Sequence, residues 1–147
     1  MNRLPSRPDA AAILHGGPAA PDLTGAVRFY QLPAGVLVVA DLTNLPPGGS
    51  GFFGFHLHEG ADCAGEDFSS TGGHYNPAGL PHPQHAGDLP PLLRFGEGAY
   101  LAVMTDRFGV DEIIGRTAVI HGGTDDFTTQ PAGNAGAKIA CGVIRRL

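Results

Sequence analysis

The 147-residue chain is long enough for one domain with a hydrophobic core and too short to suggest two. Its formal net charge is −5 and it has no block of Lys or Arg, which argues against nucleic acid or an anionic membrane as partner. Its 23 Gly and 13 Pro separate short apolar runs, so the composition favours an all-β sandwich or barrel.

No apolar run approaches the length of a transmembrane helix, and residues 1–14 contain no continuous apolar segment like that of a signal peptide. We therefore expect a cytoplasmic protein. The alternative is an exported protein whose leader is absent from this sequence.

Seven strands can be placed in chain order. Residues 1–9 are polar and contain Pro, so we expect a flexible N-terminal tail before one domain at 10–147. The predicted strands are 10–14, 24–31, 36–42, 52–58, 99–105, 116–121 and 138–144. Two longer loops, 59–91 and 122–137, interrupt them. This pattern predicts a single domain of seven or eight strands.

Residues 72–90 carry His74, His82, His85 and Asp88 in a segment with four Pro and four Gly. That composition excludes a long helix or a central strand. Disordered loops are usually rich in charge, but Asp88 is the only charged residue here. Three imidazoles and one carboxylate in a stiff loop predict a zinc site.

Further histidines lie at the ends of two predicted strands. His56 and His58 project to the same side of a strand, as two ligands of one metal would, although two surface histidines would fit the same spacing. His121 ends another strand and is followed by Asp125, and metal-bound histidines commonly donate their second N–H to a carboxylate. A structural or exposed His121 is the alternative. We expect His15, in a Gly-rich turn, at the surface.

Six histidines and Asp88 are too many ligands for one four-coordinate ion. Two metals are implied, and imidazole-rich sites suit zinc and copper. Two separate closed zinc sites would satisfy the same count. The two cysteines, Cys63 and Cys141, are either free buried thiols or a disulfide, and their number alone does not decide between these.

Six segments, in this order, resemble the copper/zinc superoxide dismutase family. They are GFHLH (54–58), GGHYNP (72–77), HAGDLP (85–90), IGRTAVIH (114–121), DDF (125–127) and GNAGAKIACGVI (133–144). The resemblance covers nearly all of residues 10–145. It implies an eight-stranded Greek-key β-sandwich or flattened barrel with a long metal-binding loop.

The resemblance also implies a role for individual residues. Copper would be bound by His56, His58, His74 and His121, and zinc by His74, His82, His85 and Asp88, with His74 bridging the two ions. Asp125 corresponds to a carboxylate that links ligands of both metals. Cys63 and Cys141 match an intrasubunit disulfide. The implied reaction converts superoxide to dioxygen and hydrogen peroxide, with His74 carrying a proton.

Two features depart from the family's pattern. The family usually has an arginine where this chain has Lys138, which keeps the charge that guides the anion but lacks the planar fork that docks it. His82 and His85 are also closer together than is usual, in a loop that Pro81 and Pro83 stiffen.

Two functions of other classes compete with the enzyme. A non-catalytic copper-binding or storage protein of the same fold would be expected to have lost some of the four copper ligands. A zinc-dependent hydrolase would need a carboxylate placed as a general base, and no motif resembles one. Candidate partners besides superoxide are a second copy of the chain and a copper donor.

Overall fold

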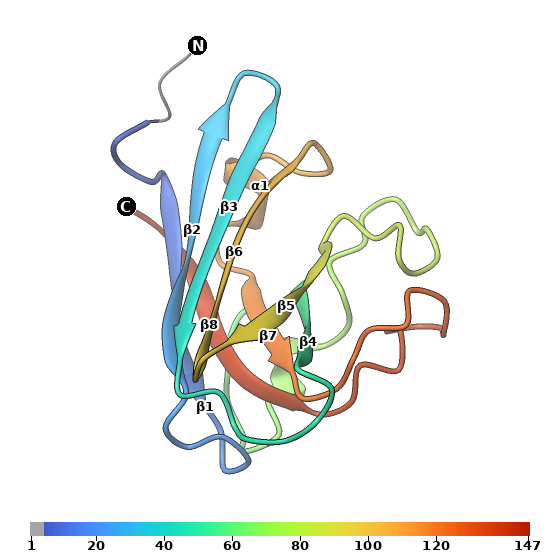
Figure 1. Ribbon diagram of the computed structural model, residues 1–147. Helices are drawn as coiled ribbons and strands as arrows, with labels where there is room; N and C mark the ends of the chain where they lie inside the picture. Colours follow the sequence, from blue (N-terminus) through green and yellow to red (C-terminus); the bar gives the residue numbers. More distant parts are fainter. Residues whose placement is uncertain (1–4) are drawn as a thin grey trace.

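The computed structural model describes residues 5–147 (Figure 1). Eight strands form a closed antiparallel barrel, in the order β1-β2-β3-β6-β5-β4-β7-β8. The strands are β1 (Ala10–Gly16), β2 (Thr24–Leu32), β3 (Gly35–Thr43), β4 (Phe52–His58), β5 (Asp88–Phe95), β6 (Gly98–Thr105), β7 (Thr117–His121) and β8 (Lys138–Arg146). Only one turn of α-helix, α1 (Val110–Ile113), and one 3-10 turn, η1 (Ser69–Thr71), interrupt the β-structure described. The predicted all-β Greek-key class is confirmed.

Strand alternation builds the core of the barrel. In β3, Val36, Val38, Ala40 and Leu42 are buried in one cluster, as successive residues on one face of a strand should be. β3 then pairs with β6 and not with β4, while β4 pairs with β5 and β7. These crossovers place β4 between β5 and β7, and pairing of β1 with β8 closes the barrel.

The predicted end of the long loop at residue 91 was wrong, because β5 already begins at Asp88. Pro90 and Pro91 concealed this strand. They lie where the register between β4 and β5 shifts, between Phe53 and Phe55, and β5 pairs with β6 only from Arg94 onward. Prolines are tolerated at such irregularities, where the missing N–H breaks no ladder hydrogen bond.

The N-terminal tail predicted at 1–9 stays a prediction, and its first four residues lie outside the described part. Asp9 hydrogen-bonds to β2: its N–H donates to Phe29 O (2.8 Å), and its Oδ2 accepts from Gln31 N–H (2.7 Å). His15 is exposed, as predicted. Within residues 5–147, no helix has the length and apolar character needed to span a membrane.

Cys63 and Cys141 form a disulfide, with their Cα atoms 5.8 Å apart. The bond joins the loop after β4 to the middle of β8. Phe68 and Val119 pack with the two cysteines in a small apolar cluster. This arrangement confirms the predicted bridge and fixes the start of the long loop against the barrel.

Removing the disulfide should destabilise the protein, because the bond closes a loop with a sequence separation of 78 residues. The double variant Cys63→Ser, Cys141→Ser is expected to lose up to about 4 kcal/mol of the free energy of unfolding. Urea denaturation of the variant and the unreduced wild type measures this loss. As a control on the bond itself, alkylation before reduction should add no mass to the wild type; two alkylated thiols would contradict the pairing.

Candidate metal centre

Two loops cover the outer side of β4 and bury its histidines. In Figure 1 the long loop after β4 and the loop after β7 extend from the same side of the barrel. Phe55 and Leu57 point into the core, so His56 and His58 point away from it, toward these loops. Yet His56 is 0% and His58 2% exposed, which a strand facing solvent would not show.

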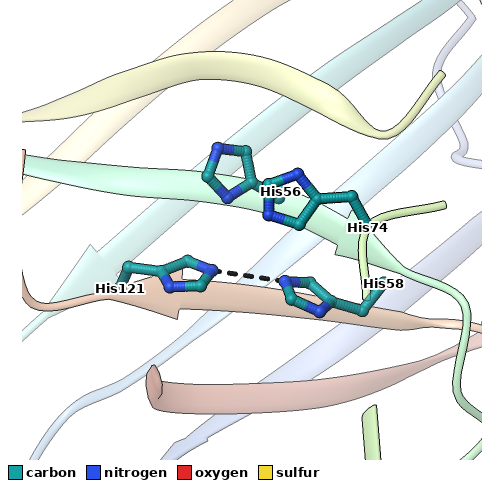
Figure 2. A group of neighbouring side chains, drawn as sticks. All are labelled: His56, His58, His74 and His121. Atoms are coloured by element: carbon teal, nitrogen blue, oxygen red, sulfur yellow. Dashed lines mark hydrogen bonds between the residues drawn. The ribbon is translucent and has the colours of Figure 1, made fainter. Parts of the chain in front are cut away.

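The structure brings six of the seven predicted ligands into two sets beneath these loops; His85 is in neither set, and His56, predicted for copper alone, is in both. Two sets of four donor atoms lie within 4.8 Å of one another: His56, His58, His74 and His121, and His56, His74, His82 and Asp88. Figure 2 shows the first set, with rings from β4, β7 and the long loop turned toward one another.

Backbone carbonyls orient two rings of the first set. His58 Nδ1–H donates to Gly72 O (2.8 Å), and His121 Nδ1–H donates to Gly136 O (3.1 Å). Because a carbonyl can only accept, Nε2 of each neutral ring is left without a proton. The two Nε2 atoms lie 3.2 Å apart (dashed in Figure 2). Two bare lone pairs at that distance repel one another unless a proton or a cation lies between them.

Asp125 orients two rings, one on β4 and one on the long loop. Its Oδ2 accepts from His56 Nε2–H and its Oδ1 from His82 Nε2–H, both at 2.8 Å. The Nδ1 atoms of both rings are therefore bare, buried and without a hydrogen-bond partner among residues 5–147. His82 Nδ1 lies 3.1 Å from Asp88 Oδ2 without hydrogen-bond alignment. A side chain at Gly133 would not fit, since its Cβ would lie 2.0 Å from Asp125 Oδ1.

His74 lies between the two sets. Its Nδ1 is 2.8 Å from Asp88 Oδ1 and 3.1 Å from His85 Nδ1, and His85 Nδ1 is itself 3.2 Å from Asp88 Oδ2. Its Nε2 is buried and has no hydrogen-bond partner in the described part of the chain. The ring stacks at a tilt on His56, with centroids 4.0 Å apart. Both nitrogens of His74 thus face a group of ligand atoms.

These observations fit two metal ions of the predicted kinds. Three of the four unpartnered buried side-chain atoms in the described residues are ring nitrogens of the cluster: His56 Nδ1, His74 Nε2 and His82 Nδ1. A buried polar atom without a partner is costly, and a bound ion removes that cost. One set is all imidazole, which suits copper, and the other contains a carboxylate, which suits zinc.

A sequence model described as copper/zinc superoxide dismutase (SODC) matches residues 23–144. The chain belongs to the copper/zinc superoxide dismutase family. It is 38% identical over 136 residues to superoxide dismutase (Cu-Zn) 1 of Aquifex aeolicus (strain VF5), covering 82% of this chain and 79% of that protein. It is also 38% identical over 143 residues to the superoxide dismutase (Cu-Zn) of Legionella pneumophila, covering 92% of this chain and 85% of that protein.

The fold of the family is also found among solved structures. A SOD-like protein from Bacillus subtilis superposes with a TM-score of 0.76 at 28% identity, covering 90% of this chain and 96% of that chain. The resemblance stated from the sequence segments is therefore confirmed.

Sequence reasoning missed two residues that hold the segment from His82 to His85 in place. The side chain of Gln130 makes two hydrogen bonds to the backbone of His82: Gln130 Oε1 accepts from His82 N–H and Gln130 Nε2 donates to His82 O, each at 2.8 Å. Arg107 donates to Pro83 O (2.7 Å) and His85 O (3.2 Å). Both come from distant parts of the chain, so no local pattern could have indicated them.

Lys138 lies at the edge of the centre. Its Nζ donates to Thr71 Oγ1 (2.8 Å) and to Gly72 O (3.0 Å). Partial burial lowers its pKa, while the negative charge of Asp67 raises it. Because Gly72 O also accepts from His58, one shared carbonyl connects the ammonium group to a residue of the cluster.

Burial keeps the rings of His58 and His121 neutral, whereas contacts with neighbouring rings keep the carboxylates of Asp88 and Asp125 ionised. Burial lowers the pKa of His58 from 6.5 to about 2, and that of His121 to about 3. Burial alone would raise the pKa of Asp125, but hydrogen bonds from His56 and His82 outweigh it and hold that pKa well below its ordinary value. In Asp88, too, burial opposes ionisation, and the contact with His74 prevails.

Acid should destabilise the metal-free protein. Below about pH 6.5 the unfolded chain takes up protons on His58 and His121, whereas the folded chain does so only near pH 2 and pH 3, respectively, so the free energy of unfolding falls as pH falls. Each ring should contribute up to about 1.4 kcal/mol per pH unit, the full slope being reached about one unit below the unfolded pKa. Urea denaturation of metal-stripped protein at pH 7, 6 and 5 measures the slope.

The variant His121→Gln should reduce that slope, and His15→Gln, which changes an exposed histidine outside the cluster, should leave it unchanged. A free energy of unfolding that does not change between pH 7 and pH 5 would contradict the proton linkage.

Proposed function

We propose that the cluster holds one copper and one zinc ion per chain: the first set binds copper, and the second set, with His85 beside Asp88 in place of His56, binds zinc. Copper is bound by His56, His58, His74 and His121, and zinc by His74, His82, His85 and Asp88. The observation that carries this assignment is His74, whose Nδ1 faces Asp88 and His85 while its buried Nε2 faces the other set. Such a ring is suited to serve two ions. Asp125, hydrogen-bonded to His56 and His82, links the two sets.

As a family member the chain is an oxidoreductase with copper and zinc as cofactors and superoxide as substrate. Two superoxide anions and two protons yield one dioxygen and one hydrogen peroxide. Bound copper supplies the one-electron exchange with each superoxide. His74 is proposed to carry at Nε2, when that nitrogen does not bind copper, the proton that it passes to the peroxide product, while Asp88 and His85 keep the ring in place from its Nδ1 side.

Lys138 is the proposed guide for the anion. It is the only lysine of the chain, and its charge helps to lower the pKa of both His58 and His121, so its field reaches the proposed copper ligands. A cation beside the reaction site can raise the association rate of an anion by roughly 10- to 1,000-fold, even on a protein whose net charge is negative.

The matched relatives carry the name superoxide dismutase, which favours the enzyme over a non-catalytic copper-storage protein. A second copy of the chain and a copper donor stay predictions, as do the absence of nucleic-acid and membrane partners and the cytoplasmic location.

Metal content tests the ligand assignment. Protein loaded with both ions should contain one copper and one zinc per chain, located by anomalous scattering at the two absorption edges. Asp88→Ala removes the only carboxylate of the zinc set and should lose zinc while copper remains. His15→Ala, outside both sets, should retain both ions. Wild-type protein that fills only one site would contradict the two-metal assignment.

Charge removal tests the guiding role. Lys138→Ala is expected to lower kcat/KM for superoxide about tenfold and to flatten its dependence on ionic strength, because the anion loses its local attraction. Copper content should not change. Arg145→Ala removes the same charge from an exposed side chain of β8 and serves as the matched control. If rate and ionic-strength dependence both stay unchanged in Lys138→Ala, Lys138 has no part in the reaction.

A further inference from the structure

We propose that Thr71 is a positioning residue for the Lys138 ammonium group. Its buried hydroxyl gives a lysine the fixed location that an arginine would reach with its own planar fork. This inference rests on the proposed role of Lys138 as the guide for superoxide, and it adds the residue that makes that role workable in this chain.

A lysine alone does not hold its charge in a fixed position. The charge lies at the end of a flexible four-carbon stem, and holding that stem in one rotamer costs conformational entropy. Here the ammonium nitrogen has two acceptors, Thr71 Oγ1 at 2.8 Å and Gly72 O at 3.0 Å. Two hydrogen bonds to a charged donor are enough to offset that cost.

The Thr71 hydroxyl is oriented to accept from the lysine. Its own proton is donated to Phe68 O at 2.8 Å, so only its lone pairs are available to Lys138. Thr71 is 0% exposed, which prevents water from replacing either partner. Phe68 packs on the disulfide between Cys63 and Cys141, so the hydroxyl is tied to the part of the loop that the disulfide holds.

The second acceptor sets the distance to the metal centre. Gly72 O accepts from Lys138 Nζ and also from His58 Nδ1–H at 2.8 Å. One carbonyl therefore joins the guiding cation to a proposed copper ligand. Thr71 and Gly72 are consecutive, so a lysine bound to both has little freedom to move toward or away from His58.

Arginine and lysine should need Thr71 to different extents. A guanidinium carries five N–H donors in a rigid fork and can engage several acceptors from one orientation. An ammonium group is a compact point charge that depends on acceptors converging on one spot. Loss of the Thr71 hydroxyl should therefore matter with lysine at position 138 and matter little with arginine there.

The test is a double-mutant comparison in the copper- and zinc-loaded protein. Thr71→Val removes the hydroxyl at constant shape, and Thr71→Ser keeps it. Thr71→Val should lower kcat/KM for superoxide about threefold to tenfold and weaken azide binding to the copper form, measured by optical titration. Thr71→Ser should resemble the wild type. In a Lys138→Arg background, Thr71→Val should have no effect on either quantity.

A measurement without copper or turnover complements these. Lys138 is the only lysine, so acetylation of the peptide that contains it reports this ammonium group alone. In metal-free protein Thr71→Val should be acetylated several-fold faster than the wild type, and Thr71→Ser should not. Thr71→Ala replaces Thr71→Val if the valine variant does not fold.

The outcomes separate this inference from the proposed function. If Lys138→Ala leaves rate and azide affinity unchanged, the guiding role itself fails. If Lys138→Ala lowers both but Thr71→Val matches the wild type, only the positioning role fails. An equal loss from Thr71→Val in Lys138 and Lys138→Ala backgrounds, or a loss of bound copper, would also overturn it, because Thr71 would then act through another group.

Discussion

The carboxylate of Asp125 accepts one hydrogen bond from a ring on the barrel, His56, and another from a ring on the long loop, His82. Each bond fixes a tautomer and turns the opposite nitrogen toward the centre. The contact exists only because the loop after β7 comes this close, which in turn requires Gly133, where a Cβ would clash with Asp125. A single acid thus couples the two loops to β4 and aims ligands of both sets.

The short segment from His82 to His85 is positioned by contacts with other parts of the chain. His82 and His85 are separated by only two residues, and the segment between them has little freedom to adjust by itself. The position is set instead from outside, by the paired hydrogen bonds of Gln130 and by Arg107 on two carbonyls. Ordering the segment costs conformational entropy, and the hydrogen bonds from Gln130 and Arg107 offset it.

Much of the fold and of the candidate site could be predicted from the sequence, and the misses share one cause. The strand at 52–58 matches β4 residue for residue, because its pattern is local. β5 was hidden, since Pro90 and Pro91 are excluded from regular pairing and only the register shift against β4 makes them acceptable. The contacts of Gln130 with His82 span 48 residues. A periodicity or a spacing carries no information about such pairs, whereas the family resemblance over nearly all of residues 10–145 implied the ligand set.

Charge explains why the histidines and carboxylates of the centre are buried while Lys138 lies at its rim. The pKa values of Asp88 and Asp125 are both lowered, so the two carboxylates are ionised in a cluster where burial keeps His58 and His121 neutral. Two negative charges in a poorly solvated site are unfavourable without compensation, and divalent cations provide it. A buried lysine would compete with those cations for the same ligands. At the rim, held by Thr71 and Gly72, Lys138 instead leaves the ligands free and adds positive potential where an anion must enter, although the protein as a whole carries a charge of −5.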